Sequence, residues 1–168
     1  MTDYVIGVDL GGTRLRAALL DTDFNIVKRE ETLTKAHEGR DATLDRIKSL
    51  IREILPEDTS TVRGIGISAP GPLNPNTGVV VAPPNLPGWQ DVQLGHILKE
   101  AFDLPVYVGN DANVAMLAEA AHGSAQGYRH AIYITVSTGI GSGIVVDGRL
   151  LLGKQGLAAE AGHMVMLV

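Results

Sequence analysis

The chain has 168 residues, a length that allows one domain, or one domain and part of a second. It carries 14 lysines and arginines against 19 aspartates and glutamates, and its basic residues are scattered along a chain of net charge −5, which argues against nucleic acid as a partner. There are no cysteines, so a disulfide framework and thiol catalysis are excluded.

The first third of the chain predicts a three-strand antiparallel meander. Connections between its strands are short, as they are between antiparallel neighbours. The strand-forming runs cover residues 4–10, 15–20 and 26–33. Asp41 then has the residue type of a helix N-cap, and apolar residues at helical spacing follow it as far as Leu55, before Pro56 ends the helix.

Strands and helices alternate in the middle of the chain. We expect strands over 62–69 and 105–108, helices over 92–102 and 112–121, and an ordered loop rich in Pro, Gly and Asn over 83–91. The predicted class is therefore α/β, with a mixed sheet opened by the antiparallel meander.

Residues 123–128 are the best candidate for a domain boundary. We therefore predict an N-terminal lobe over 1–125 and the beginning of a second lobe over 126–168. The second lobe repeats the strand–turn–strand opening of the first, with runs over 131–136, 143–146 and 149–152 and a hairpin turn at 147–148.

The N-terminus has no basic segment followed by an apolar stretch, as a signal peptide would have. No apolar run approaches the ~18 residues of a membrane-spanning helix. These two features predict a cytoplasmic protein without a membrane partner.

The first glycine-rich loop, Asp9-Leu10-Gly11-Gly12-Thr13, joins two predicted strands. Asp9 could hold Mg²⁺ through water, since this ion takes few carboxylates together with phosphate oxygens and water. The phosphate-binding groups would be the backbone at Gly11 and Gly12, the Thr13 hydroxyl and the guanidinium of Arg14 or Arg16. The alternative is a tight hairpin that needs glycines for geometry alone. A strand follows the glycines, so the loop is not a Rossmann fingerprint, and it lacks the Gly-Lys-Ser/Thr of a Walker loop.

A second glycine-rich loop over 135–143 places Gly139, Gly141 and Gly143 in alternation after Ser137-Thr138. By itself this pattern fits a flexible glycine hairpin as well as it fits a phosphate loop. The presence of the first loop in the same chain favours the functional interpretation.

Between the two loops, Asn110-Asp111 stands at the end of a predicted strand and the start of a predicted helix. Open α/β sheets bind ligands outside the carboxyl ends of their strands, so this is a position for a site. Locally, a helix N-cap is the simpler interpretation. A carboxylate between two phosphate loops is what a kinase requires, because the pair of loops can hold a nucleotide triphosphate and the carboxylate can take a proton from an acceptor.

Several other residues carry no motif that assigns them a function. Glu160 and His163 frame an Ala-Gly pair, and residues of this kind near a glycine are usually structural or exposed. Trp89 is either a core residue or a wall of the site. The other four histidines show no metal-ligand spacing and are expected at the surface.

Taken in order, these segments resemble bacterial sugar kinases of the ROK family (repressor, open reading frame, kinase), and particularly their glucokinases. The resemblance covers nearly the whole chain. Its matching stretches are 7–13, 69–72, 84–89, 110–113, 138–143 and 160–163.

This resemblance implies an actin-like ATPase (ribonuclease H-like) fold of two lobes with the site in the cleft. It implies ATP and Mg²⁺ as cofactors and a hexose, most of all glucose, as substrate. Asp111 would be the general base. The sugar ligands would be Gly71, Asn85, Asn110, Glu160 and His163. The ATP phosphates would be held by Asp9, Gly11, Gly12, Thr13, Arg14, Thr138, Gly139 and Gly141.

In the family, a cysteine-rich zinc motif and another sugar-binding Glu follow the Glu-x-Gly-His element, and His163 would be a zinc ligand in members with a structural zinc. This chain stops at Val168, before that point. The resemblance therefore implies an N-terminal portion with an incomplete second lobe, an incomplete zinc ligand set and a homodimer in the full-length form.

Two other classes share the fold. Sugar-sensing repressors of the family carry a helix-turn-helix domain ahead of the kinase-like part, for which the first strand at Tyr4 leaves no room, and Asp111 also favours the enzyme. A chaperone-type or cytoskeletal ATPase would not need the sugar-loop segments 85–89 and 160–163. A fragment that is inactive by itself is a further alternative.

Overall fold

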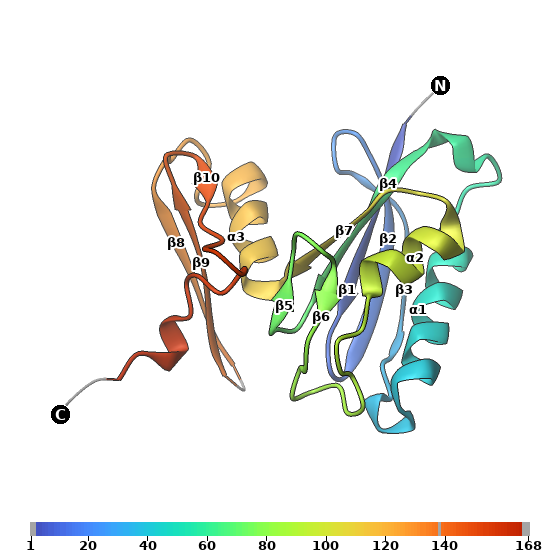
Figure 1. Ribbon diagram of the computed structural model, residues 1–168. Coiled ribbons are helices and arrows are strands. Elements are labelled where there is room, and N and C mark those ends of the chain that lie inside the picture. The colour runs from blue at the N-terminus through green and yellow to red at the C-terminus, as the bar shows by residue number, and fades with distance from the viewer. Residues whose placement is uncertain (1–2, 138, 166–168) are drawn as a thin grey trace. The chain divides into compact units, whose positions relative to one another are not determined.

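The computed structural model describes residues 3–137 and 139–165 (Figure 1). It divides into two compact units, Met1–Gly109 and Asn110–Val168. Within the part of the chain that the structure describes, no helix is both long and apolar enough to cross a membrane.

The first unit contains a five-stranded mixed sheet in the order β3-β2-β1-β4-β7. Its strands are β1 (Tyr4–Leu10), β2 (Arg14–Asp21), β3 (Ile26–Leu33), β4 (Val62–Ala69) and β7 (Val106–Asn110). The first three strands are antiparallel neighbours, whereas β1 and β4 are parallel. The predicted meander and mixed sheet are therefore confirmed.

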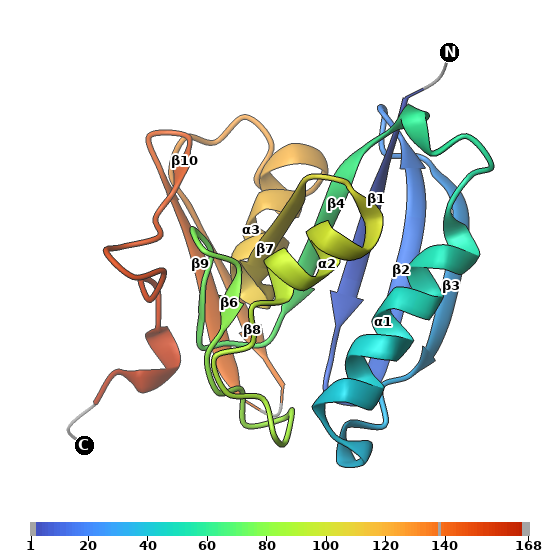
Figure 2. The ribbon, with the colours of Figure 1, turned by 45° about the vertical axis from the view of Figure 1, so that its right-hand side comes forward.

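Helices α1 (Arg40–Ile54) and α2 (Leu94–Phe102) lie over the same face of this sheet (Figures 1 and 2). Every second side chain along the strands packs against these helices, because successive side chains of a strand point to opposite faces of the sheet. The resulting core is almost entirely aliphatic. It includes Ile6, Val8, Leu10, Leu15, Ala17, Leu19, Ile47, Ile51, Ile54, Ile65, Ile67, Leu94 and Leu98.

The prediction of Asp41 as the cap of α1 is wrong. The helix begins at Arg40, and its N-cap is Gly39, which has φ 93° and no side chain to cap with. Asp41 lies in the first turn, where a carboxylate is favoured by the helix dipole, and it accepts a 2.8 Å hydrogen bond from Arg40. An acidic residue near a helix start fits both positions, so the sequence could not separate them.

A two-stranded ribbon, β5 (Leu73–Asn74) and β6 (Val79–Val80), was not predicted, because two-residue strands leave no periodic pattern. The loop 83–91 is closed at its base by hydrogen bonds in both directions between the backbones of Val80 and Val92, of 2.9 and 2.8 Å. Trp89 in this loop is only 4% exposed and belongs to the core, which answers the question left open by the sequence.

The second unit packs helix α3 (Asp111–His122) on a three-stranded antiparallel sheet, in the order β10-β9-β8. Its strands are β8 (Ala131–Val136), β9 (Ile140–Val146) and β10 (Arg149–Leu150). Strand β9 begins three residues before the predicted start, at Ile140 rather than at Gly143. Two segments complete the described part, a loop after β10 and the 3₁₀ turn Ala161–His163.

Helix α3 packs so closely on β9 that only glycine fits at position 143 of the strand. A Cβ at Gly143 would lie 2.6 Å from the carbonyl oxygen of Ala112 and 2.7 Å from Cβ of Met116. This packing ties α3 to the strands that follow it. The compact units divide between residues 109 and 110, so α3 falls in the second unit. The lobe boundary after residue 125 stays a prediction.

Candidate active site

The first unit holds the first glycine-rich loop in a fixed shape. Gly11 donates its backbone N–H to the carbonyl oxygen of Arg14 at 2.9 Å, closing the turn between β1 and β2. Thr34, which is fully buried, ties the loop from below: its Oγ1 donates to the Gly11 carbonyl at 2.6 Å, and its N–H donates to the Thr13 carbonyl at 2.9 Å. The sequence offered no signal for Thr34, because its role depends on the loop lying across it.

Asp9 lies at the end of β1 with both carboxylate oxygens in use. Oδ2 accepts a hydrogen bond from Nη1 of Arg16 at 2.9 Å, and Oδ1 accepts one from Oγ of Ser68 at 3.3 Å. Ser68 was not among the predicted site residues. Arg14, predicted to bind phosphate, pairs with Glu31 at 2.7 Å, and its side chain is 54% exposed. It is therefore accessible to a ligand.

Asn85 of the loop 83–91 lies directly against the first glycine-rich loop. A Cβ placed on Gly12 would come within 2.9 Å of Cβ of Asn85. The structure thus brings a predicted phosphate residue and a predicted sugar residue together within one unit. Gly71, which follows β4, is partly buried.

Gly12→Ala is expected to push the two loops apart and to weaken binding of both sugar and nucleotide. The added methyl group meets Asn85 Cβ and, at 3.3 Å, the Asn85 carbonyl oxygen, so the loop backbone must shift. Isothermal titration with each ligand measures the effect. Gly66→Ala is the matched control, because a Cβ there meets only the Ile6 carbonyl oxygen, at 4.0 Å. Equal affinities in the two variants would contradict the expectation.

The second unit presents Asn110 and Asp111 at the start of α3. Asn110 is the N-cap: its Oδ1 accepts hydrogen bonds from the backbone N–H groups of Ala112, at 3.0 Å, and Asn113, at 3.4 Å. Asp111 is exposed, and its Oδ1 accepts from the N–H of Ala112 at 2.8 Å. Among the described residues nothing bonds its Oδ2, so one oxygen of the carboxylate is engaged and the other is able to accept a proton.

Asn113, in the first turn of the same helix, is a residue that the sequence did not single out as a site residue. It is 5% exposed, and its Oδ1 has no hydrogen-bond partner among the described residues. A buried amide oxygen without a partner is uncommon in proteins.

The second glycine-rich loop lies between β8 and β9, where Ser137 donates its N–H to the Gly139 carbonyl at 2.8 Å. Thr138, a predicted phosphate residue, lies outside the described residues. Gly141 is part of β9, opposite Thr135, and a Cβ there would lie 3.3 Å from Cβ of Ala112. Gly141 and Gly143 therefore serve the packing of α3 on β9, a role that the sequence interpretation did not consider.

The Glu160–His163 segment is held on the start of β9. Gly162 lies so close to the carbonyl oxygen of Ile140 that no Cβ fits there, and Ser142 Oγ donates to the Ala159 carbonyl. Glu160 and His163 project as exposed side chains, with Oε2 of the first 3.9 Å from Nε2 of the second. The second unit thus gathers the glycine-rich loop, the start of α3 and this segment around one end of β9.

The described residues fit magnesium better than zinc. Asp9 offers a carboxylate beside a loop predicted to bind phosphate, and Mg²⁺ needs only one or two carboxylates besides phosphate oxygens and water. A structural zinc takes four Cys, His or carboxylate ligands. Within 3–137 and 139–165, no three His, Cys, Asp or Glu side chains form a group that could hold a metal ion, and His163 has only Glu160 near it.

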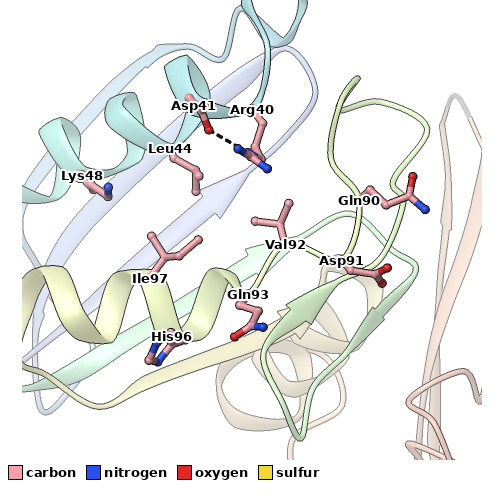
Figure 3. Close-up of a pocket in the computed structure, with 10 residues that line it drawn as sticks. All are labelled: Arg40, Asp41, Leu44, Lys48, Gln90, Asp91, Val92, Gln93, His96 and Ile97. Atoms are coloured by element: carbon pink, nitrogen blue, oxygen red, sulfur yellow. Dashed lines mark hydrogen bonds and ion pairs between the residues drawn. The ribbon is translucent and has the colours of Figure 1, made fainter.

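A surface pocket of about 490 Å³ also opens in the first unit, between the start of α1 and the start of α2 (Figure 3). None of the predicted site residues lines it. Arg40 at its rim is bound to Asp41, and this hydrogen bond lowers the pKa of the Asp41 carboxyl.

Sequence comparison finds sugar kinases and regulators. The chain is 36% identical over 162 residues to a glucokinase of Thermotoga maritima, covering 96% of this chain and 50% of that protein. It is 37% identical over 158 residues to an N-acetylmannosamine kinase of Salmonella paratyphi A, covering 94% and 53%. A putative xylose repressor of Caldicellulosiruptor sp. is 34% identical over 165 residues, covering 96% and 41%. The chain thus spans about half the length of the curated relatives it matches.

The solved structures that resemble this chain include kinases of the ROK family. A ROK family glucokinase from Streptomyces griseus, in complex with glucose and AMPPNP, superposes with a TM-score of 0.86 at 32% identity, covering 98% of this chain and 51% of that one. The ROK hexokinase from Thermus thermophilus gives 0.84 at 39% identity, covering 98% and 54%. The predicted actin-like ATPase fold is therefore confirmed. The model of the ROK family matches residues 5–167, and the chain belongs to that family.

Proposed function

We propose that the protein is an ATP-dependent hexose kinase that converts glucose into glucose 6-phosphate. One observation carries the proposal: a carboxylate, Asp111, is oriented at the start of α3 with an oxygen that is unbonded among the described residues, in a chain whose relatives include glucokinases. The glucose and AMPPNP complex of the Streptomyces griseus enzyme supports the choice of sugar and nucleotide.

In this mechanism the 6-hydroxyl oxygen of the sugar attacks the γ-phosphorus of ATP. The new oxygen–phosphorus bond forms as the bond between the γ-phosphorus and the bridging oxygen breaks, and ADP leaves. Asp111 accepts the hydroxyl proton as the attack proceeds. Phosphoryl transfer depends mostly on positioning and charge neutralisation, which the two glycine-rich loops and Arg14 supply through backbone N–H groups and a guanidinium. Magnesium, held through Asp9, would neutralise phosphate charge.

Sugar selection is assigned to Asn85, Asn110, Glu160, His163 and the backbone of Gly71. Paired polar groups reject the wrong epimer because they are left without partners when one hydroxyl is misplaced. The relatives named above include an N-acetylmannosamine kinase. The direct test is therefore a coupled ADP-release assay on an active chain that contains this sequence, with glucose, mannose and N-acetylmannosamine in parallel. ADP release with glucose at the highest kcat/KM is the expected result.

A sugar-sensing regulator is the second candidate, favoured by the similarity to a xylose repressor. The same assay separates the two functions. A regulator would bind sugar without sugar-dependent ADP release, whereas a kinase releases ADP only when its sugar is present.

Glu160→Ala and Asn85→Ala are each expected to raise the KM for the sugar and to leave the KM for ATP nearly unchanged. Each side chain would lose a hydrogen bond to a hydroxyl, worth about 0.5–1.5 kcal/mol, and more for the charged Glu160. Steady-state kinetics of an active chain that contains this sequence, with both substrates varied, provides the measurement. Glu57→Ala, at an exposed position between α1 and β4, is the control. A change confined to the KM for ATP would remove these residues from the sugar site.

A further inference from the structure

Four polar side chains form one row across the sheet of the first unit. Strand register places Asp9 opposite Arg16 on β2 and opposite Ser68 on β4, and it places Arg16 opposite Glu31 on β3. Directly opposed residues of neighbouring strands share a face of the sheet. Val8 and Leu10, on either side of Asp9, are buried toward the helices, so the row occupies the other face.

The row places the positive side chain of Arg16 between the negative side chains of Glu31 and Asp9, with the neutral Ser68 beyond Asp9. Glu31 Oε2 lies 3.5 Å from Nε of Arg16, and Arg16 Nη1 donates to Asp9 Oδ2 at 2.9 Å. Ser68 Oγ completes the row by donating to Asp9 Oδ1 at 3.3 Å. Arg16 thus donates a hydrogen bond to Asp9 and forms an ion pair with Glu31, whereas its buried Nε has no hydrogen-bond partner among the described residues. Asp9 is held at both oxygens.

These contacts restrict rotation of the Asp9 carboxylate. They leave some of its hydrogen-bond acceptor positions free. Two carboxylate oxygens offer about four acceptor positions, and the row fills one on each oxygen. The carboxylate remains 48% exposed on its side chain, so its other acceptor positions are open to water or a ligand. Arg16 also offsets a negative charge that would otherwise stand unbalanced beside the phosphates.

We propose that Arg16 and Ser68 are positioning residues for Asp9: they hold its carboxylate in the orientation in which it takes up the hydrated magnesium ion that accompanies ATP. This inference rests on the proposed kinase function. A direct phosphate contact is the other role open to Arg16. The positioning role is favoured because Arg16 already donates a hydrogen bond to Asp9 and forms an ion pair with Glu31.

The test measures binding of a non-hydrolysable ATP analogue to the full chain by calorimetry, over a range of Mg²⁺ concentrations and in EDTA. Partners that orient a metal ligand typically contribute 10- to 100-fold to metal affinity, so Arg16→Gln is expected to raise the half-saturating Mg²⁺ concentration by roughly that factor. Nucleotide affinity in EDTA and sugar affinity should change little. Ser68→Ala should act in the same direction but more weakly, since its contact with Asp9 is longer.

Two further variants make the result specific. Arg16→Lys keeps a positive donor near Asp9 and should recover most of the Mg²⁺ dependence. Arg29→Gln removes an arginine that also contacts Glu31, at 3.4 Å, but lies outside the row, and should resemble the wild type. Thermal unfolding of every variant checks that the sheet is intact, since a variant that no longer folds would lose sugar binding as well.

An unchanged Mg²⁺ dependence in Arg16→Gln overturns the inference. So does an equal loss of nucleotide affinity with and without Mg²⁺, which would make Arg16 a phosphate ligand. Failure of the proposed function is distinguishable in a longer chain that contains this sequence and the rest of its relatives' length. If that wild type binds nucleotide with Mg²⁺ but phosphorylates no sugar, the kinase is refuted, and the binding data still report on Arg16. A wild type without Mg²⁺-dependent nucleotide binding overturns both.

Discussion

Asp111→Asn is expected to abolish sugar phosphorylation in an active chain that contains this sequence, lowering kcat by about 10²–10⁴-fold. Asparagine has nearly the same shape and keeps an oxygen that can accept the N–H of Ala112, so the start of α3 should remain intact. An amide oxygen cannot take the proton that leaves the sugar hydroxyl. Sugar affinity should therefore stay within about tenfold of the wild type, roughly the worth of one hydrogen bond.

The measurement combines a coupled ADP assay for kcat with calorimetry for sugar affinity. Asp147→Asn is a matched control, because Asp147 is an exposed aspartate of the same unit, in the turn between β9 and β10, and asparagine tolerates its positive φ of 52°. Near-normal turnover in Asp111→Asn would reduce Asp111 to a first-turn helix residue and would remove the observation on which the proposed function stands.

A polypeptide of these 168 residues by itself is expected to show no useful sugar phosphorylation. The kinases it resembles are about twice as long. Proteins of this kind complete their site by closing around the substrates, which excludes water and aligns the reacting groups. Alignment can be worth roughly 7–11 kcal/mol of the barrier, so its loss would make turnover undetectable. A coupled ADP assay with glucose decides the matter, and robust turnover by a monomeric, zinc-free protein would contradict the expectation.

The same polypeptide is expected to self-associate through β8. Ile132, Ile134 and Val136 alternate along this strand with 64, 59 and 76% of their surfaces exposed, and they share a face with the exposed Ile140. Neither a charge nor a proline interrupts the strand, whereas β3, at the edge of the other sheet, carries four charged residues and a bulge. An apolar face of this kind favours association.

Light scattering with size-exclusion chromatography checks this expectation across a range of concentrations. Ile134→Lys should shift the protein toward the monomer, because it places a charge at the centre of the apolar face. Tyr107→Lys, at a position 72% exposed in β7 of the other unit, serves as the control. Metal analysis of the same sample should find zinc absent or weakly held, since His163 has no cysteine partners in the sequence.

The strands of the five-stranded sheet could be predicted from the sequence, as could the motifs from which the candidate site is proposed. Residues 26–33 and 62–69 form strands with the predicted bounds, because periodicity and turn residues are local properties of the chain. The glycine-rich loop after Asp9 and the Asn110-Asp111 pair could likewise be found by residue type and spacing. A strand or motif can be predicted from the sequence when all of its characteristic residues lie in one short segment.

Only the tertiary structure decided which residues support these motifs. The row from Glu31 to Ser68 exists because strand register brings together positions as far as 59 residues apart, which no local pattern encodes. Thr34 ties the first loop because the chain returns beneath it, and Trp89 is buried because a closed loop packs it on the core. Helix α3 belongs with the second unit because it packs on glycines of β9, some thirty residues later in the chain. The residue types of a segment determine what that segment can do chemically. Strand register and packing determine which other segments hold it in place, and these depend on the whole fold.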